Sequence, residues 1–348
     1  MRVLVTGGAG YIGSVLVPKL LARGHEVRVL DRMFWGLPHY ATLPGVELVN
    51  ADVRRIPEGV LDGIDAVDHL AGFSNDPTSE YSPDANWQMN AVATERIANL
   101  CLRAGVRRFV FGSSCSLYDG LGTDELLDET TEIRPRGAYA TSKHYSEQAL
   151  KAAASKGEFE PVILRQATVF GASPRMRFDL VVNSFVKDAL VRQRLVLHGG
   201  GRMYRPLVSV EDLAEAHIAC LEAPSELVAG ETFNVVQENY RVRDLAETVA
   251  GALDRLGKPV SLEDGPLPSI VRNYRCSGTK LRERLNLSFA TTPAHAVEQL
   301  IDIYGQVPVE ELGHPKYYNI TWMELLESVR PAYQAMQNIF EPLDEEGA

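Results

Sequence analysis

The stretch "RVLVTGGAGYIG", residues 2–13, decides the fold class of this chain. Its first five residues are rich in valine and leucine, which is typical of a short buried strand. Glycines follow in two overlapping patterns, Gly8-x-Gly10-x-x-Gly13 and Gly7-x-x-Gly10-x-x-Gly13. Glycine permits a positive φ and lets backbone N–H groups approach a pyrophosphate at the positive end of the next helix. The stretch therefore predicts a strand, a tight turn and a helix that together bind a dinucleotide.

The same alternation continues along the chain. Strands are expected at "EVRVL", "VELVN", "AVDHLAG", "RFVFGSS" and "PVILRQATVF", with helices from about residue 11, across 86–103 and across 139–151. Alternating strands and helices build right-handed βαβ units. We therefore predict an α/β fold: a doubly wound parallel Rossmann sheet with a smaller, mostly C-terminal substrate-binding lobe.

A break in this alternation, "GASPRMRF" from Gly171, sets the expected domain boundary. Residues 1–170 would form the NAD-binding domain. The pattern at about 204–236 reads as strand, capped turn, helix and strand, and it would return to that domain. Residues 171–203 and 237–348 would form the smaller, substrate-binding lobe over the carboxyl edge of the sheet.

Charge and composition exclude several classes of partner. The 348 residues include 35 basic and 46 acidic side chains, a net charge of −11, and no basic block that would attract nucleic acid or an anionic membrane. There is no apolar run of about 18 residues and no secretory signal at the start, so we expect a soluble, cytoplasmic protein. The widely spaced cysteines predict neither disulfides nor a metal site. They are Cys101, Cys115, Cys220 and Cys276.

An acidic residue ends the second expected strand. Asp31 stands eighteen positions after Gly13, where a carboxylate accepts hydrogen bonds from the ribose hydroxyls and repels a 2′-phosphate. NAD is therefore the expected cofactor. Arg32 could accommodate a 2′-phosphate, so NADP stays open as the alternative. Asp52, after the third strand, is either an acceptor for the adenine amino group or a turn residue.

The pair in "YATSK" predicts proton transfer. Tyr139 and Lys143 are four residues apart and share one helix face. A phenol with a pKa of about 10 is a poor base at neutral pH, but a neighbouring ammonium favours the phenolate. Ser114 ends a strand at the carboxyl edge, where ligands of open α/β sheets bind, and its hydroxyl could hold the same sugar oxygen.

At this point the chain resembles an extended short-chain dehydrogenase/reductase of the nucleotide-sugar epimerase and dehydratase branch, similar to UDP-glucose 4-epimerases. The matching segments span residues 1 to about 290: "TGGAGYIG", "DHLAG", "SSCSLYD", "YATSK", "LRQATVFG", "YRPLVSVEDLA" and "YRCSGTKLRERLNL". The resemblance implies Ser114, Tyr139 and Lys143 as the catalytic set. It implies these residues around NAD: Gly7, Gly10, Tyr11, Ile12, Gly13, Asp31, Arg32, Asp52, Val53, Leu70, Ala71, Gly72, Asn90, Tyr139 and Lys143.

The two residues after Ser114 separate the reactions of this branch. The resembling 4,6-dehydratases have an Asp-Glu pair where Cys115 and Ser116 stand, and the uronic-acid decarboxylases have a Glu at the second place. Loss of water or CO₂ is therefore disfavoured, and C4 epimerisation through a transient 4-keto sugar is the leading interpretation. The alternatives are a 4-keto-sugar reductase or dehydrogenase, and a C3/C5 epimerase that enolises its substrate with the Cys115 thiol. A non-catalytic NAD-sensing protein is a fourth possibility.

The expected substrate site combines sugar-facing and phosphate-facing residues. Arg205 matches the family's phosphate or ribose ligand, and Arg272 is the candidate for a second arginine. Arg175 and Arg177 could contact a phosphate or a uronate, or be a solvated loop. Thr168 stands where many relatives have an Asn. Thr168, Ser114, Cys115 and Ser116 are the other residues of the expected substrate site. The resemblance also implies a homodimer through helices at about 86–103 and 139–155.

Overall fold

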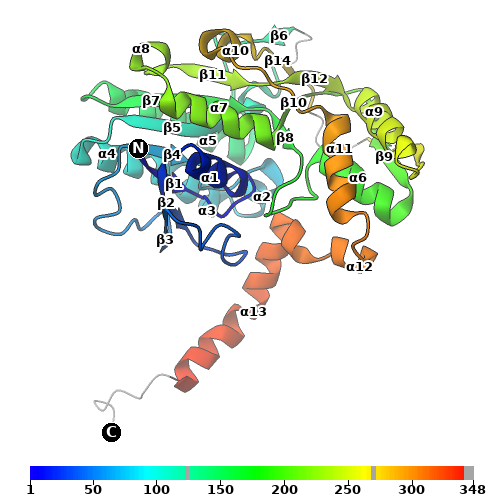
Figure 1. Cartoon of the computed structure of the whole chain (residues 1–348), viewed down its shortest axis with the longest axis horizontal. Helices are drawn as coiled ribbons and strands as arrows, with labels where there is room; N and C mark the ends of the chain where they lie inside the picture. Colours follow the sequence, from blue (N-terminus) through cyan, green and yellow to red (C-terminus); the bar gives the residue numbers. More distant parts are fainter. Residues whose placement is uncertain (122–124, 268–271, 341–348) are drawn as a thin grey trace.

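The computed structural model describes residues 1–121, 125–267 and 272–340, and its centre is a seven-stranded sheet (Figure 1). The order is β11-β7-β5-β4-β1-β2-β3, and every pairing is parallel. The strands are β1 (Arg2–Thr6), β2 (Glu26–Asp31), β3 (Val46–Asn50), β4 (Ala66–His69), β5 (Arg108–Ser114), β7 (Glu160–Gln166) and β11 (Thr232–Val235). Strands are added outward from β1 in both directions, which is the doubly wound arrangement. The predicted fold class is confirmed.

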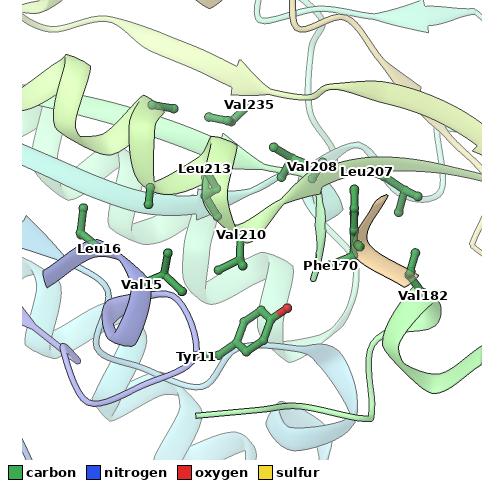
Figure 2. Close-up of a cluster of buried hydrophobic side chains, with 14 of the residues drawn as sticks. Tyr11, Val15, Leu16, Phe170, Val182, Leu207, Val208, Val210, Leu213 and Val235 are labelled. Atoms are coloured by element: carbon green, nitrogen blue, oxygen red, sulfur yellow. The ribbon is translucent and has the colours of Figure 1, made fainter. Parts of the chain in front are cut away.

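Successive side chains of β1 point to two separate cores, as the period of two in a strand requires. Val3 and Val5 belong to one core, and Leu4 belongs to the other. Helices α1 (Gly13–Ala22) and α7 (Val210–Glu222) contribute to the first core; α4 (Ala93–Ala104) and α5 (Gly137–Ala154) contribute to the second. Figure 2 shows Leu16 of α1 and Leu213 of α7 within the first core, with Tyr11 at its edge.

Two expected elements are divided in the structure. "PVILRQATVF" forms β7 and then, after Ala167, a separate strand β8 (Thr168–Phe170). β8 leaves the central sheet and pairs with β10 (Tyr204–Ser209), which also pairs with β12 (Glu238–Arg241). The helix expected across 86–103 begins as α3 (Pro83–Asn86), continues through a π-helical segment at Trp87–Val92 and ends as α4. A π segment inside a helix often marks a functional site.

The remaining elements form the smaller lobe and its connections. They are α2 (Asp76–Tyr81), β6 (Leu126–Leu127), α6 (Val181–Arg192), β9 (Arg194–His198), α8 (Ser225–Val228), α9 (Val242–Arg255), β13 (Ser261–Gly265), β14 (Arg275–Cys276), α10 (Thr279–Leu285), α11 (Pro293–Tyr304), α12 (Val309–Leu312) and α13 (Asn319–Phe340), with 3₁₀ turns at Cys115–Tyr118, Gly199–Gly201 and Pro315–Tyr317. Residues 268–271 and 341–348 of the predicted lobe lie outside the described residues. None of the described helices combines the length and apolar character needed to cross a membrane.

The last helix leaves the body of the protein. Only the first part of α13 lies against the rest of the chain, and its far end projects into solvent (Figure 1). Its exposed apolar side chains include Leu325 and Val329. The start of α13 contacts the central domain, so the C-terminal part of the chain returns to the carboxyl edge of the sheet.

Candidate active site

A cavity of about 660 Å³ lies at the carboxyl edge of the central sheet. Its wall contains residues that end or follow four parallel strands: Gly7 after β1, Asp31 of β2, Leu70 after β4 and Ser114 of β5. Segments that follow Gly171 contribute further parts of the wall, including Arg205 of β10. This is the edge at which ligands of doubly wound sheets bind.

The glycine-rich turn forms one end of this cavity. Gly7 has φ +74°, and a Cβ added there would lie 2.7 Å from the backbone nitrogen of Ala71. The turn can therefore adopt this shape only with glycine at that position. Gly10, Tyr11 and Ile12 also line the cavity, at the N-terminus of α1. The N–H groups at the N-terminus of α1 suit a pyrophosphate.

The acidic residue of β2 is held rigidly at the cavity wall. The Asp31 carboxylate accepts hydrogen bonds from the backbone N–H groups of Ala9 (3.1 Å) and Met33 (2.8 Å). Burial raises its pKa, and the backbone hydrogen bonds act in the opposite direction. Asp31 lines the cavity together with Val53, Leu70, Ala71 and Gly72. Its oxygens keep further lone pairs that ribose hydroxyls can use.

Arg32 and Asp52 form an ion pair with each other. The Arg32 Nη1 atom lies 2.6 Å from Asp52 Oδ2, and Arg54 Nη2 lies 2.6 Å from the same oxygen. These two arginines hold the pKa of the Asp52 carboxyl well below its usual range. Asp52 does not line the cavity. Its carboxylate is therefore engaged by both arginines, and Arg32 is held in an ion pair at the rim of the cavity.

Asn90 acts on the cavity indirectly. It lies in the π-helical segment, is buried, and does not line the cavity itself. Its Oδ1 accepts a hydrogen bond from the backbone N–H of Phe73 (2.8 Å), and its Nδ2 donates to the Phe73 carbonyl (3.1 Å). Asn90 therefore holds the loop after β4 in place, and that loop forms part of the wall.

The structure brings Ser114, Tyr139 and Lys143 together in the cavity wall. The Ser114 side chain lies close enough to the Tyr139 hydroxyl to lower the pKa of that phenol. Ser114 Oγ also accepts from the backbone N–H of Ser116 (3.1 Å). Lys143 Nζ donates to the Gly112 carbonyl (2.7 Å) and lies 5.9 Å from the centre of the Tyr139 ring. Ser114 and Tyr139 can thus act on one substrate oxygen, with the Lys143 ammonium on the same wall.

Burial dominates the protonation of this set. It raises the pKa of the Tyr139 phenol to about 12; the Asp76 charge adds to that increase and the Ser114 side chain opposes it. Burial also lowers the pKa of Lys143 to about 8. The positive charges of Arg177 and Arg272 act to lower the phenol pKa, but desolvation outweighs them in the protein alone.

The residues after Ser114 face different surroundings. Ser116 lines the cavity, and its buried Oγ has no hydrogen-bond partner among the described residues. Cys115 is fully buried, does not line the cavity, and donates its S–H to the Arg165 carbonyl (3.1 Å). Burial raises the pKa of its thiol well above the ordinary value. Cys115 thus has the character of a small buried apolar residue.

The predicted substrate arginines share one part of the wall. Arg205, Arg272 and Thr168 all line the cavity. The Arg272 guanidinium forms an ion pair with Asp76 and lies 3.8 Å from Asp119. Arg205 Nη1 donates to the carbonyls of Tyr204 and Arg272.

Sequence reasoning missed several lining residues and left others open. Asp76 begins α2 directly after the β4 loop, so the rule that ligands bind at the carboxyl edge could have found it. Arg175 and Arg177, for which contact with a ligand was one of two interpretations, both line the cavity. Asn319 also does so, from the first position of α13, and no local pattern in the sequence indicates this.

Comparisons with known proteins agree with this geometry. A family model described as "NAD dependent epimerase/dehydratase family" matches residues 3–235. UDP-glucuronic acid decarboxylase 1 of Xenopus tropicalis is 30% identical over 233 residues, which cover 64% of this chain and 54% of that protein. UDP-glucose 4-epimerase of Corynebacterium glutamicum is 27% identical over 283 residues, which cover 76% and 84%. The chain spans about half the length of the decarboxylases that it matches.

The fold is also similar to that of solved structures. The crystal structure of UDP-glucose 4-epimerase from Thermus thermophilus in complex with NAD has a TM-score of 0.76 and 28% sequence identity. The match covers 88% of this chain and all of that one.

Proposed function

The chain belongs to the NAD-dependent epimerase/dehydratase family, and on that premise we propose that it is an NAD-dependent nucleotide-sugar epimerase that inverts C4 of the sugar. The observation that carries the proposal is that every carboxylate in the described part of the cavity wall is already engaged. Asp31 accepts two backbone N–H groups, Asp76 is paired with Arg272, and Asp179 with Arg177. The neighbours of Ser114 in the wall are the hydroxyls of Ser116 and Thr168, not carboxylates. This supports epimerisation over loss of water or CO₂.

The residues fit NAD. The turn at Gly7 leaves no space for a side chain, so its backbone is free to approach a pyrophosphate. Asp31 is fixed as an acceptor for the ribose hydroxyls, while Arg32 is paired with Asp52. This favours NAD over NADP. When bound, NAD supplies the acceptor and later the donor of the C4 hydride, together with a positive charge close to the sugar.

Tyr139 is the proposed acid and base. Its phenolate oxygen, beside the Ser114 side chain, takes the proton of the C4 hydroxyl, and the resulting phenol returns that proton at the end of the cycle. Ser114 holds the same oxygen. Positive charge beside the phenol favours the phenolate and opposes the desolvation that raises the pKa of Tyr139 to about 12. Lys143 supplies part of that charge from a position fixed by the Gly112 carbonyl.

Arg205 and Arg272 are the proposed ligands of the sugar nucleotide's diphosphate. Both are partly buried cations in the cavity wall, and the planar guanidinium group suits phosphate oxygens. An anchored diphosphate would let the keto sugar turn over and present its opposite face while the nucleotide stays in place.

Proton NMR in D₂O tests the proposal. The purified protein is mixed with UDP-, dTDP- and GDP-hexoses and uronates, with no cofactor added. We expect a new epimer without deuterium at a ring carbon. Deuterium at C3 or C5 would show enolisation, and a pentose product would show decarboxylation. Turnover that consumes added NAD or NADH in proportion to product would show a dehydrogenase or reductase. Each of these results would refute the proposal.

A pair of variants on one helix assigns the chemistry to Tyr139. Tyr139→Phe is expected to lower kcat by about 10²-fold or more, as loss of a general acid–base group does. Tyr145→Phe is the matched control, because that hydroxyl is bonded to Glu95 at the exposed side of α5. Full activity in Tyr139→Phe would contradict the assignment.

Three further expectations belong to this proposal. Residues 1–170 with about 204–236 would hold NAD, and residues 171–203 with 237–348 would hold the nucleotide sugar. A homodimer would form through α4 and α5 and the segment before them, where Val92 is exposed, and light scattering in solution tests it. A cytoplasmic location accords with four free cysteines in the described chain.

A further inference from the structure

The C-terminal part of the chain is fastened to the loop that follows Asp31. The Trp35 indole N–H donates to the Lys316 carbonyl (3.1 Å), and the Trp322 indole N–H donates to the Phe34 carbonyl (2.9 Å). The two indole rings are stacked, with centroids 6.5 Å apart and planes 25° apart. The start of α13 is thus held beside the loop that directly follows the expected ribose-binding residue, Asp31.

Arg175 lies where this contact meets the cavity. Its guanidinium carbon is 3.8 Å from the centre of the Trp35 ring, and its Nη2 donates to Asn319 Oδ1 (2.6 Å). Asn319 is fixed in turn, because its Nδ2 donates to Ser74 Oγ (3.0 Å). The guanidinium is therefore oriented from both sides, by a ring on one face and an amide at one edge.

The remaining N–H groups of Arg175 are unused. Arg175 is only 9% exposed, and neither Nε nor Nη1 has a hydrogen-bond partner among the described residues. Burial lowers the pKa of this guanidinium to about 9, and the charge of Asp31 acts in the opposite direction. A buried cation with two unsatisfied donors is costly to a protein unless an anion accepts from them.

The loop that carries Arg175 is bound to the glycine-rich turn. The Tyr11 hydroxyl donates to the Gly171 carbonyl (2.7 Å), and Ser173 Oγ donates to the Tyr11 carbonyl (2.7 Å). Tyr11 belongs to the turn that precedes α1, where a pyrophosphate is expected. Arg175 lines the same cavity as Tyr11 and Asp31, and both of these residues influence the pKa of its guanidinium.

From this arrangement we infer that Arg175, oriented by Trp35 and Asn319, binds the pyrophosphate of the dinucleotide, and that residues 316–322 are therefore part of the cofactor site. The inference rests on the proposed use of NAD. It would add a charged ligand to the backbone N–H groups at the N-terminus of α1. It also explains how NAD could stay bound through many turnovers, as an epimerase that recycles its cofactor requires.

Calorimetric titration of the full chain, freed of nucleotide, tests the inference. Arg175→Met is expected to weaken NAD and ADP-ribose by about 10- to 100-fold, the loss typical of hydrogen bonds to a charged group. The affinity of the Arg175→Met protein for adenosine and for UDP should stay within about twofold of that of the wild type. Asn319→Ala, which removes only the orienting amide, should weaken the same two ligands by a smaller factor. Arg330→Ala, at an exposed position farther along α13, is the matched control and should change nothing.

The unfolding midpoint without nucleotide separates binding from a structural role. In Arg175→Met it should be equal to or higher than that of the wild type, because the variant removes a buried cation with unsatisfied donors. If Arg175→Met unfolds too readily to titrate, the same affinities are measured for Arg175→Lys and Asn319→Ala instead.

Three results would overturn the inference. Unchanged NAD affinity in Arg175→Met would show that the guanidinium makes no contact. A loss confined to UDP would place Arg175 in the substrate site, and a loss confined to 2′,5′-ADP would assign it to a 2′-phosphate. These titrations require no turnover, so an absence of epimer in the NMR assay would reject the proposed chemistry and leave this inference standing.

Discussion

Replacement of Lys143 is expected to remove a large pH dependence from the stability of the nucleotide-free protein. The folded protein lowers the pKa of this lysine from 10.5 to about 8, because the ammonium is buried. The difference of roughly 2.5 units corresponds to about 3.4 kcal/mol of unfolding free energy at pH 7. Lys143→Met keeps the length of the side chain and removes the charge.

The sign of the effect follows from proton binding. Between pH 8 and 10.5 the unfolded chain binds more protons at this lysine than the folded chain does, so the wild type gains stability as the pH rises. From about pH 7 to about pH 9.5 the penalty should fall from roughly 3.4 to roughly 1.4 kcal/mol, a gain of about 2 kcal/mol relative to Lys143→Met. The lost hydrogen bond to the Gly112 carbonyl shifts the two curves by a constant and leaves their relative slope unchanged.

Urea unfolding of both proteins across this pH range measures the difference. Lys151→Met, which replaces an exposed lysine of the same helix, is the control and should show no pH-dependent difference from the wild type. A constant difference between the wild type and Lys143→Met, or one that changes with the opposite sign, would refute the argument that burial of an ammonium controls this site.

Other substitutions test the turn, the core and the cysteine. Gly7→Ala is expected to abolish NAD binding and to destabilise the fold by more than Gly105→Ala does. Both glycines have a positive φ, which costs a residue with a Cβ about 1–2 kcal/mol, but only at Gly7 would the new Cβ also meet backbone, 2.7 Å from Ala71 N. Equal unfolding midpoints of the two variants would contradict this. Glu147→Gln removes the buried partner of Arg165, which lies 2.8 Å away, and should lower the unfolding free energy in urea by about 3–5 kcal/mol; a loss below about 1 kcal/mol would show that Arg165 finds another acceptor. Cys115→Ala should keep wild-type turnover, since its thiol is buried behind the wall, and a large fall in kcat would revive the enolising alternative.

The parts of this protein that could be predicted from sequence are those set by local backbone chemistry. The glycine turn, the strand that ends at Asp31 and the helical pair Tyr139 and Lys143 are each encoded within a few residues. Hydrophobic periodicity and turn residues report such features directly. The fold class, the family and the dinucleotide site at the first turn were therefore accessible from the order of residues alone, and the fold class and family are confirmed.

Tertiary packing decided how the side chains around that frame are used. The sequence alone left Arg32 open as a 2′-phosphate ligand and Cys115 open as a catalytic thiol; the structure pairs the first with Asp52 and buries the second. Arg175 and Asn319 are 144 positions apart, yet they share one hydrogen bond at the cavity. Which partner a polar side chain finds depends on elements brought together only in the folded chain, and burial then sets the charge that each group carries.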